Sequence, residues 1–179
     1  MAVRQLIYAP DPIFKKTSEA VAEVTDETRA MIADLHDTLQ FEEGVGMAAP
    51  MIGVLERVIV ANLLPDGKSE PLTFINPEVT WESEEMQTVD EASLCFPGIG
   101  APITRPKAIK LSYIDEQGTQ QTFEANDFLS SVIQHEIDYL DGKTYLDYLS
   151  KMKRDILLKK MQKIMKHTPP HVHNAHCNH

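Results

Sequence analysis

The sequence predicts a single domain that contains both helices and strands. Apolar residues recur at three- and four-residue intervals between Asn126 and Gly142, which is the spacing of an amphipathic helix. Apolar runs at 57–63 and 72–75, and alternating apolar residues at 109–113, are typical of strands. The 179 residues are 42% hydrophobic and 25% charged, which suffices for one hydrophobic core. We find no internal repeat and expect no second domain.

Charge is unevenly spread along the chain. The net charge is -10, but residues 150–166 hold seven Lys/Arg and one Asp, so they carry +6 and the remainder carries -16. An acidic body does not suit general nucleic-acid binding, and we expect no sequence-specific DNA partner. No apolar run approaches the roughly 20 residues of a membrane span, and the N-terminus lacks the apolar segment of a signal peptide. We therefore expect no membrane association, a cytoplasmic location and two reduced cysteines.

The N-terminal half predicts one helix, a glycine-rich segment and several strands. Residues 3–8 form either a short strand or an extended arm. A helix is expected from Thr25, as N-cap, to Glu43, with Gly44 as the residue that closes it. Residues 44–53 are small enough to let another backbone or a ligand approach closely, although a plain turn is the simpler interpretation. Strands are predicted at 57–63, 72–75, 109–113 and 119–123, and residues 79–88 form either another strand pair or an irregular acidic segment.

The C-terminal part predicts a basic helix and a tail. Residues 150–166 form a helix with lysines around an apolar stripe, which includes Ile156, Leu157 and Ile164. We expect this stripe to pack on the same domain as residues 1–149. Residues 167–179 hold five of the seven histidines and lack any core pattern. This His-rich tail is either a disordered segment or a site for soft or borderline metals.

The central helix at 126–142 carries part of a catalytic signature. His135 and Tyr139 are four residues apart, so both project from one face. In the H-E-x-x-H helix of zinc hydrolases that face carries two histidine ligands, and the glutamate after the first is the general base. Here Tyr139 stands in place of the second histidine, while His135 and Glu136 match. Half of the signature is therefore present.

Three motifs occur in order along the chain. They read Gly44-Val-Gly-Met-Ala-Ala-Pro-Met51, Glu91-Ala-Ser-Leu-Cys95 and Gln134-His-Glu-Ile-Asp-Tyr-Leu-Asp-Gly142. With them the chain resembles peptide deformylases along nearly its whole length, whose motifs are G-x-G-x-A-A-x-Q, E-G-C-L-S and Q-H-E-x-D-H-L-D-G. Matches at Phe96-Pro-Gly98 and Arg105-Pro106 add to the resemblance. It implies an α+β fold, with mixed or antiparallel sheets around the metal-site helix and a C-terminal helix.

The resemblance also implies a reaction and a set of site residues. Peptide deformylases remove the N-formyl group from N-formylmethionyl nascent peptides by hydrolysis, with a divalent metal that is usually Fe²⁺ and otherwise Zn²⁺, Ni²⁺ or Co²⁺. The family's three metal-ligand positions fall here on Ser93, His135 and Tyr139. Its catalytic positions fall on Glu136, Leu94 and Met51. The N–H of Leu94 completes the oxyanion site in the family, and the family has glutamine at the position of Met51. Its substrate-binding positions fall on Gly44, Gly46 and Leu94.

The changes at these positions disfavour a bound metal. A serine hydroxyl does not ionise near neutral pH, and a tyrosine ionises only near pH ~10, so neither replaces a thiolate or an imidazole well. We therefore expect no metal at the family site. Met51 has no hydrogen-bond donor, and loss of one oxyanion donor typically costs about 10²–10³ in rate. Whether the protein is an enzyme stays open.

Cys95 lies two residues from the ligand position at Ser93. If this segment is extended, both side chains point to the same side, and Cys95 can supply a sulfur ligand. It can also act as a nucleophile beside His135, with Glu136 as the orienting group. The simpler interpretation is a small buried hydrophobic residue.

Three functions from different classes remain open. The first is binding of N-formyl peptides or nascent-chain N-termini, with hydrolysis impaired or lost. The second is an active amide hydrolase with a non-standard metal or a mechanism based on Cys95. The third is a metal-binding protein that acts through its His-rich tail. The resemblance also implies that the basic helix at 150–166 contacts the ribosome, and the alternative is a solvated helix face.

Overall fold

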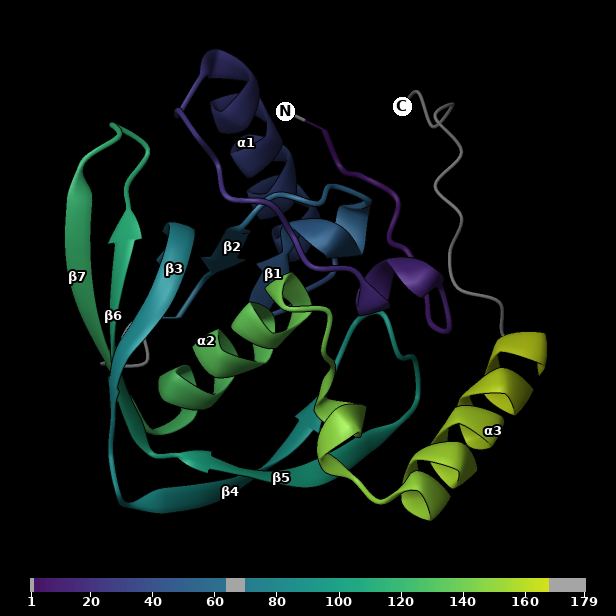
Figure 1. The fold of residues 1–179 in the computed structure, drawn as a ribbon. Coiled ribbons are helices and arrows are strands. Elements are labelled where there is room, and N and C mark those ends of the chain that lie inside the picture. Colours follow the sequence, from purple (N-terminus) through teal and green to yellow (C-terminus); the bar gives the residue numbers. More distant parts are fainter. Residues whose placement is uncertain (1, 64–69, 168–179) are drawn as a thin grey trace.

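Two antiparallel sheets enclose one central helix. The computed structural model describes residues 2–63 and 70–167. Helix α2 (Asp127–Leu140) lies between a five-stranded sheet and a two-stranded sheet, and helices α1 (Asp26–Phe41) and α3 (Lys151–His167) lie at the periphery (Figure 1). The described residues also contain three short 3-10 helices: η1 (Pro12–Lys15), η2 (Ala49–Ile52) and η3 (Tyr145–Tyr148). The predicted α+β class is confirmed.

The strands of the described residues form one five-stranded sheet and one two-stranded sheet. The larger sheet has the order β1 (Gly46–Ala48), β2 (Val58–Ala61), β3 (Leu72–Glu82), β6 (Ala108–Ile114), β7 (Gln120–Asn126). The smaller sheet pairs β4 (Met86–Ala92) with β5 (Gly100–Pro106). All these pairs are antiparallel, and the structure adds one isolated parallel bridge between Glu19 and Glu56. Residues 79–88 hold the end of β3, a connection at 83–85 and the start of β4; these strands belong to different sheets, so they form no strand pair with each other.

Helix α1 begins as the sequence predicts but ends differently. The Thr25 hydroxyl accepts from the Thr28 N–H, and the Thr28 side chain accepts from the Thr25 N–H. The prediction that Gly44 closes the helix is wrong, since the left-handed residue after it is Glu43, with φ of 53°. Gly44 is small for another reason: a Cβ there would lie 2.8 Å from the Leu39 side chain. Residues 3–7 form no strand, and Arg4 N–H donates to Thr38 on α1.

Helix α2 is buried on nearly every side, because both sheets cover it. Ten of its 14 residues are buried, and five of these are polar or charged: Ser130, Ser131, Gln134, His135 and Glu136. Asn126 is the N-cap residue without a side-chain hydrogen bond, and Gly142 follows the helix with φ of 69°. A Cβ at Gly142 would lie 2.9 Å from the Lys15 backbone, so the chain passes closely there. The amphipathic pattern therefore predicts the buried apolar face of this helix but not the burial of its polar residues.

Helix α3 packs through a few residues only. Met161 is fully buried, while Leu157 and Leu158 contact the core in part. The prediction that Ile156 is packed is wrong, since 60% of it is exposed. None of the helices in residues 2–63 and 70–167 is both long and apolar enough to cross a membrane. The His-rich tail lies, apart from His167, outside the described residues.

A buried ion cluster joins α2 to the smaller sheet. Arg105 of β5 donates to Glu91 of β4, with Nε 2.6 Å from Oε1, and to Asp138 of α2, with Nη1 2.8 Å from Oδ2. The side chains of Arg105 and Glu91 are only 3% and 5% exposed. Tyr148 adds its ring beside the guanidinium and accepts from it. Three elements that are distant in sequence are therefore held by one guanidinium.

We predict that Arg105→Met strongly destabilises the fold. The substitution keeps much of the apolar volume but leaves the Glu91 and Asp138 carboxylates without their cation, which typically costs about 3–5 kcal/mol. Urea unfolding at neutral pH measures this loss. Lys107→Met is the matched control, because Lys107 pairs with Glu85 at 2.9 Å on the surface and should change stability far less. Equal losses in the two variants would show that the buried cluster does not hold the sheet to α2.

Candidate functional site

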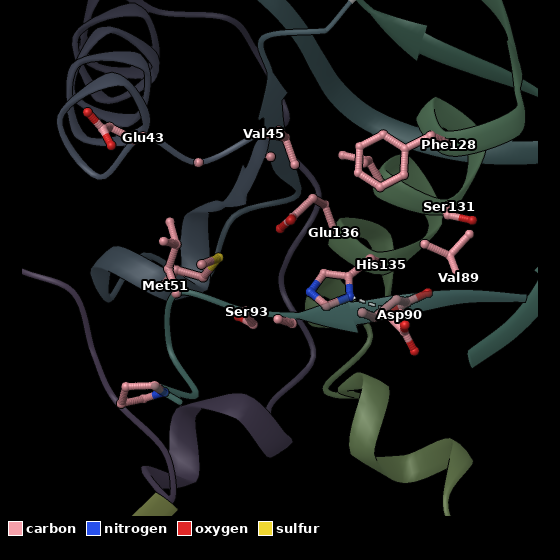
Figure 2. A pocket seen from close by; sticks show the side chains of 17 residues that line it. Glu43, Val45, Met51, Val89, Asp90, Ser93, Phe128, Ser131, His135 and Glu136 are labelled. Atoms are coloured by element: carbon pink, nitrogen blue, oxygen red, sulfur yellow. Dashed lines mark hydrogen bonds and ion pairs between the residues drawn. The ribbon is translucent and has the colours of Figure 1, made fainter. Parts of the chain in front are cut away.

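A cavity of about 490 Å³ lies beside α2 and is bounded by β1, β4 and the loop after β4. Figure 2 shows Met51, Ser93, His135 and Glu136 around it, contributed by three separate parts of the chain. Seven of the predicted site residues line this cavity: Gly44, Gly46, Met51, Ser93, Leu94, His135 and Glu136. The other two, Tyr139 and Cys95, do not line it. The fold thus brings together most of the predicted site.

His135 is fixed by a carboxylate behind it. Its Nδ1 lies 2.8 Å from Glu91 Oε2, and the ring stacks on Tyr145 with centroids 5.6 Å apart. An imidazole that donates from Nδ1 to a carboxylate keeps Nε2 for another partner. Burial alone would lower the pKa of His135, but the hydrogen bond to Glu91 and the nearby Glu136 raise it overall. The ion cluster therefore sets both the orientation and the proton affinity of this imidazole.

Glu136 is a buried carboxyl without a complete set of partners. It is 5% exposed, and its Oε2 has no hydrogen-bond partner among the described residues. Burial raises the pKa of Glu136 to about 7, because a charged carboxylate is poorly solvated there. Gly46 makes room for it, since a Cβ at this position would lie 3.0 Å from Glu136 Oε1 and 2.8 Å from Val132. The glycine of the first motif thus serves close packing of β1 on α2.

The two altered ligand positions contact each other directly. Ser93 Oγ and Tyr139 OH are 2.7 Å apart and share a hydrogen bond. Tyr139 is fully buried, with its ring edge-to-face against Phe14 at 5.4 Å and against His135 at 5.6 Å. Burial raises the pKa of Tyr139 well above its usual value, so the phenol is neutral at physiological pH. One hydroxyl thus donates to the other, at two positions where the family has metal ligands.

This donor set does not fit the divalent metal that the resemblance implies. Two neutral hydroxyls and one imidazole are weak ligands for iron or zinc, which bind best to thiolate and imidazole. The Ser93–Tyr139 hydrogen bond also occupies the two positions from which such an ion would be held. Residues 2–63 and 70–167 contain no group of three or more His, Cys, Asp or Glu that could hold a metal. The chemistry of these residues thus supports no metal-dependent step.

Cys95 lies in the core rather than in the cavity. The expectation of an extended backbone from Ser93 to Cys95 is wrong, because Phe96 N–H donates to the Ser93 carbonyl and closes a turn. Cys95 is fully buried, and its N–H donates to Ser93 Oγ. Burial, with Glu136 and Glu42 nearby, raises the pKa of the Cys95 thiol well above its usual value. A buried, neutral thiol that does not line the cavity disfavours both a ligand and a nucleophile role.

Met51 and Leu94 keep their places beside the cavity. Met51 is 1% exposed, and its sulfur accepts from the Ala48 N–H at 3.3 Å. A thioether has no donor, so it cannot stabilise a developing oxyanion. Leu94 is half-buried in the turn after Ser93. Its Cδ1 would lie 3.0 Å from a Cβ at Gly44, so this side chain packs against the glycine. The site therefore offers a shaped apolar wall where the family has a polar group.

Sequence reasoning missed much of the cavity wall. The missed lining residues are Glu43, Val45, Val89, Asp90, Ala92, Pro97, Phe128, Ser131 and Val132, besides Glu91. Phe128 is the most informative, because a large apolar residue in the first turn of a buried helix remains 46% exposed at the cavity. No local pattern marks such residues, since they meet only after the sheets close around α2.

Known proteins resemble this chain both in sequence and in fold. Residues 3–155 match the family described as polypeptide deformylase. A peptide deformylase-like protein of Rickettsia conorii is 51% identical, over 98% of this chain and 96% of its own length. A peptide deformylase of Rickettsia akari is 39% identical, over 92% of this chain and 97% of its own. A crystal structure of peptide deformylase from Ehrlichia chaffeensis superposes with a TM-score of 0.88 at 32% identity, and covers 93% of this chain and 98% of that one. The chain therefore belongs to the polypeptide deformylase family.

Proposed function

We propose that this protein binds the N-terminus of a formylated or nascent peptide in the cavity beside α2, with metal-dependent hydrolysis lost. One observation carries the proposal. The cavity is open and about 490 Å³ in volume, yet the ligand positions next to it hold a Ser93–Tyr139 hydroxyl pair. Binding needs only the cavity, whereas the family reaction needs the ion as well.

The edges of both sheets support peptide binding. β1 and β4 are end strands, and residues from both line the cavity. An exposed strand edge can pair with an extended peptide through main-chain hydrogen bonds, while neighbouring pockets select side chains. Val45, Val89, Leu94 and Phe128 supply an apolar surface for one such side chain. The expected ligand is thus an extended peptide end with an apolar first residue.

One observation favours a second candidate, residual amide hydrolysis. Glu136 has a buried carboxyl group that faces the cavity and has an unpartnered oxygen, as a general base requires. In that case formate would be released slowly from a formylated peptide without added metal, and Glu136→Gln would stop the release. No formate after prolonged incubation would remove this candidate.

We predict that a formylated or free methionyl tripeptide binds with one-to-one stoichiometry and that the protein holds little zinc or iron. A form ending at Lys166 avoids metal held by the tail, and elemental analysis with calorimetry gives both quantities. Phe128→Ala should weaken binding about fivefold, since it removes part of the apolar wall. Ile156→Ala is the matched control, because Ile156 is exposed on α3, outside the cavity. Stoichiometric metal that is lost on His135→Ala would contradict the proposal.

We predict that Ser93→Cys, Tyr139→His and Met51→Gln together restore metal binding and formyl-peptide hydrolysis. Ser93 and Tyr139 are in direct contact, and the His135 ring lies beside Tyr139, so the three ligand positions already converge. Metal content and formate release are the measurements. The double variant with Tyr139 retained should hold no metal, since ligands act as a unit. A folded triple variant that binds metal but stays inert would place the defect in the peptide cavity instead.

We also propose that α3 contacts the ribosome, which would place the protein in the cytoplasm. Its lysines at 151, 153, 159, 160, 163 and 166 are exposed, whereas Arg154 is paired with Asp147. Exposed lysines on an acidic protein suit phosphate groups, and each contact releases counterions.

We predict that Lys159→Glu with Lys163→Glu abolishes cosedimentation with ribosomes and that wild-type cosedimentation falls steeply between about 50 and 200 mM salt. Lys110→Glu is the control, because Lys110 is an exposed lysine of β6, away from α3. Unchanged cosedimentation in the α3 variant would reduce this helix to a solvated face.

A further inference from the structure

The charges around the cavity are strongly one-sided. Four acidic residues line it: Glu43, Asp90, Glu91 and Glu136. Among the described residues no lysine or arginine lines it, and His135 is the one basic side chain there. Glu91 is already neutralised by Arg105 and His135. Glu43, Asp90 and the ionised form of Glu136 therefore make the cavity better suited to a cationic ligand than to an anionic one.

Glu136 points to the kind of group that the cavity receives. Its Oε2 is buried and has no partner in the described part of the chain. Figure 2 shows the Glu136 side chain turned toward the space between Met51 and His135. A buried carboxyl oxygen without a partner costs free energy unless a bound molecule donates a hydrogen bond to it. A donor that also carries positive charge offsets the cost of burying the carboxylate.

A formyl group is a poor match for this wall. Its oxygen needs hydrogen-bond donors, but Met51 has none and the Ser93 hydroxyl is shared with Tyr139, so of the family's oxyanion donors only the Leu94 N–H is left. The peptide's free α-ammonium, by contrast, has three N–H donors and one positive charge. Val45, Val89 and Phe128 at the same cavity suit an apolar first side chain next to that ammonium.

Building on peptide binding at this cavity, we infer that the ligand is a peptide with a free, charged N-terminus and an apolar first residue, and that Glu136 binds the ammonium. The protein thereby discriminates against the formylated end that its family hydrolyses. A reaction that removes the formyl group must then precede binding, so this protein recognises the product of that reaction.

Calorimetry with the full chain in the presence of a chelator tests the inference. The probes are one methionyl tripeptide amide with a free N-terminus, its N-formyl form and its N-acetyl form. We expect the free amine to bind at least about tenfold more tightly than either blocked peptide, because charge-assisted hydrogen bonds are the stronger ones. Glu136→Gln should abolish this preference while the variant stays folded. Glu27→Gln, an exposed residue of α1 outside the cavity, should preserve it.

The outcomes separate this inference from the function on which it rests. Formyl peptide binding as tight as that of the free amine would overturn the ammonium inference and leave peptide binding intact. Preference for the free amine that survives in Glu136→Gln would overturn the assignment to Glu136. If none of the three peptides binds, the proposed function fails, and the inference fails with it.

Discussion

The Glu91 carboxylate is the point on which the site depends. It accepts from the Arg105 guanidinium through both oxygens and from His135 Nδ1 through one of them. Arg105 extends the network to Asp138, so the smaller sheet and α2 are fixed relative to each other. Burial raises the cost of each charge, but these charges are paired and hydrogen-bonded, which is the condition under which proteins tolerate them. The orientation of His135 toward the cavity is a consequence.

This network persists although the chemistry in front of it has changed. The Arg105–Glu91–His135 contacts are made between protein side chains through Nδ1 of the imidazole, and they require no ion. The Ser93 and Tyr139 hydroxyls contact each other at 2.7 Å, and the Tyr139 ring packs edge-to-face against Phe14. Both side chains at these positions therefore have buried partners within the protein.

The cavity keeps its shape but has a different electrostatic character. Met51 presents a thioether, and its sulfur is held by the Ala48 N–H. Glu136 stays buried with one unpartnered oxygen, while Glu43 and Asp90 add negative charge from the rim. A wall rich in acceptors and poor in donors favours a ligand that brings donors and positive charge. On the inference drawn above, these positions decide which peptide end the cavity receives.

The sequence by itself determined the family, the fold class and most of the elements. The α2 pattern, the Thr25 cap and the β6–β7 hairpin depend on local periodicity and capping, which act over a few residues. The ordered motifs also placed Gly46, Ser93, His135 and Glu136 at one site. Tertiary structure decided the rest. Gly44 does not close α1, Ile156 is exposed, and a turn directs Cys95 into the core. The Ser93–Tyr139 hydrogen bond joins residues 46 positions apart, and the acidic wall brings together Glu43 and Glu136, which are farther apart still. Such contacts depend on how the sheets pack around α2, and no local sequence pattern encodes that packing.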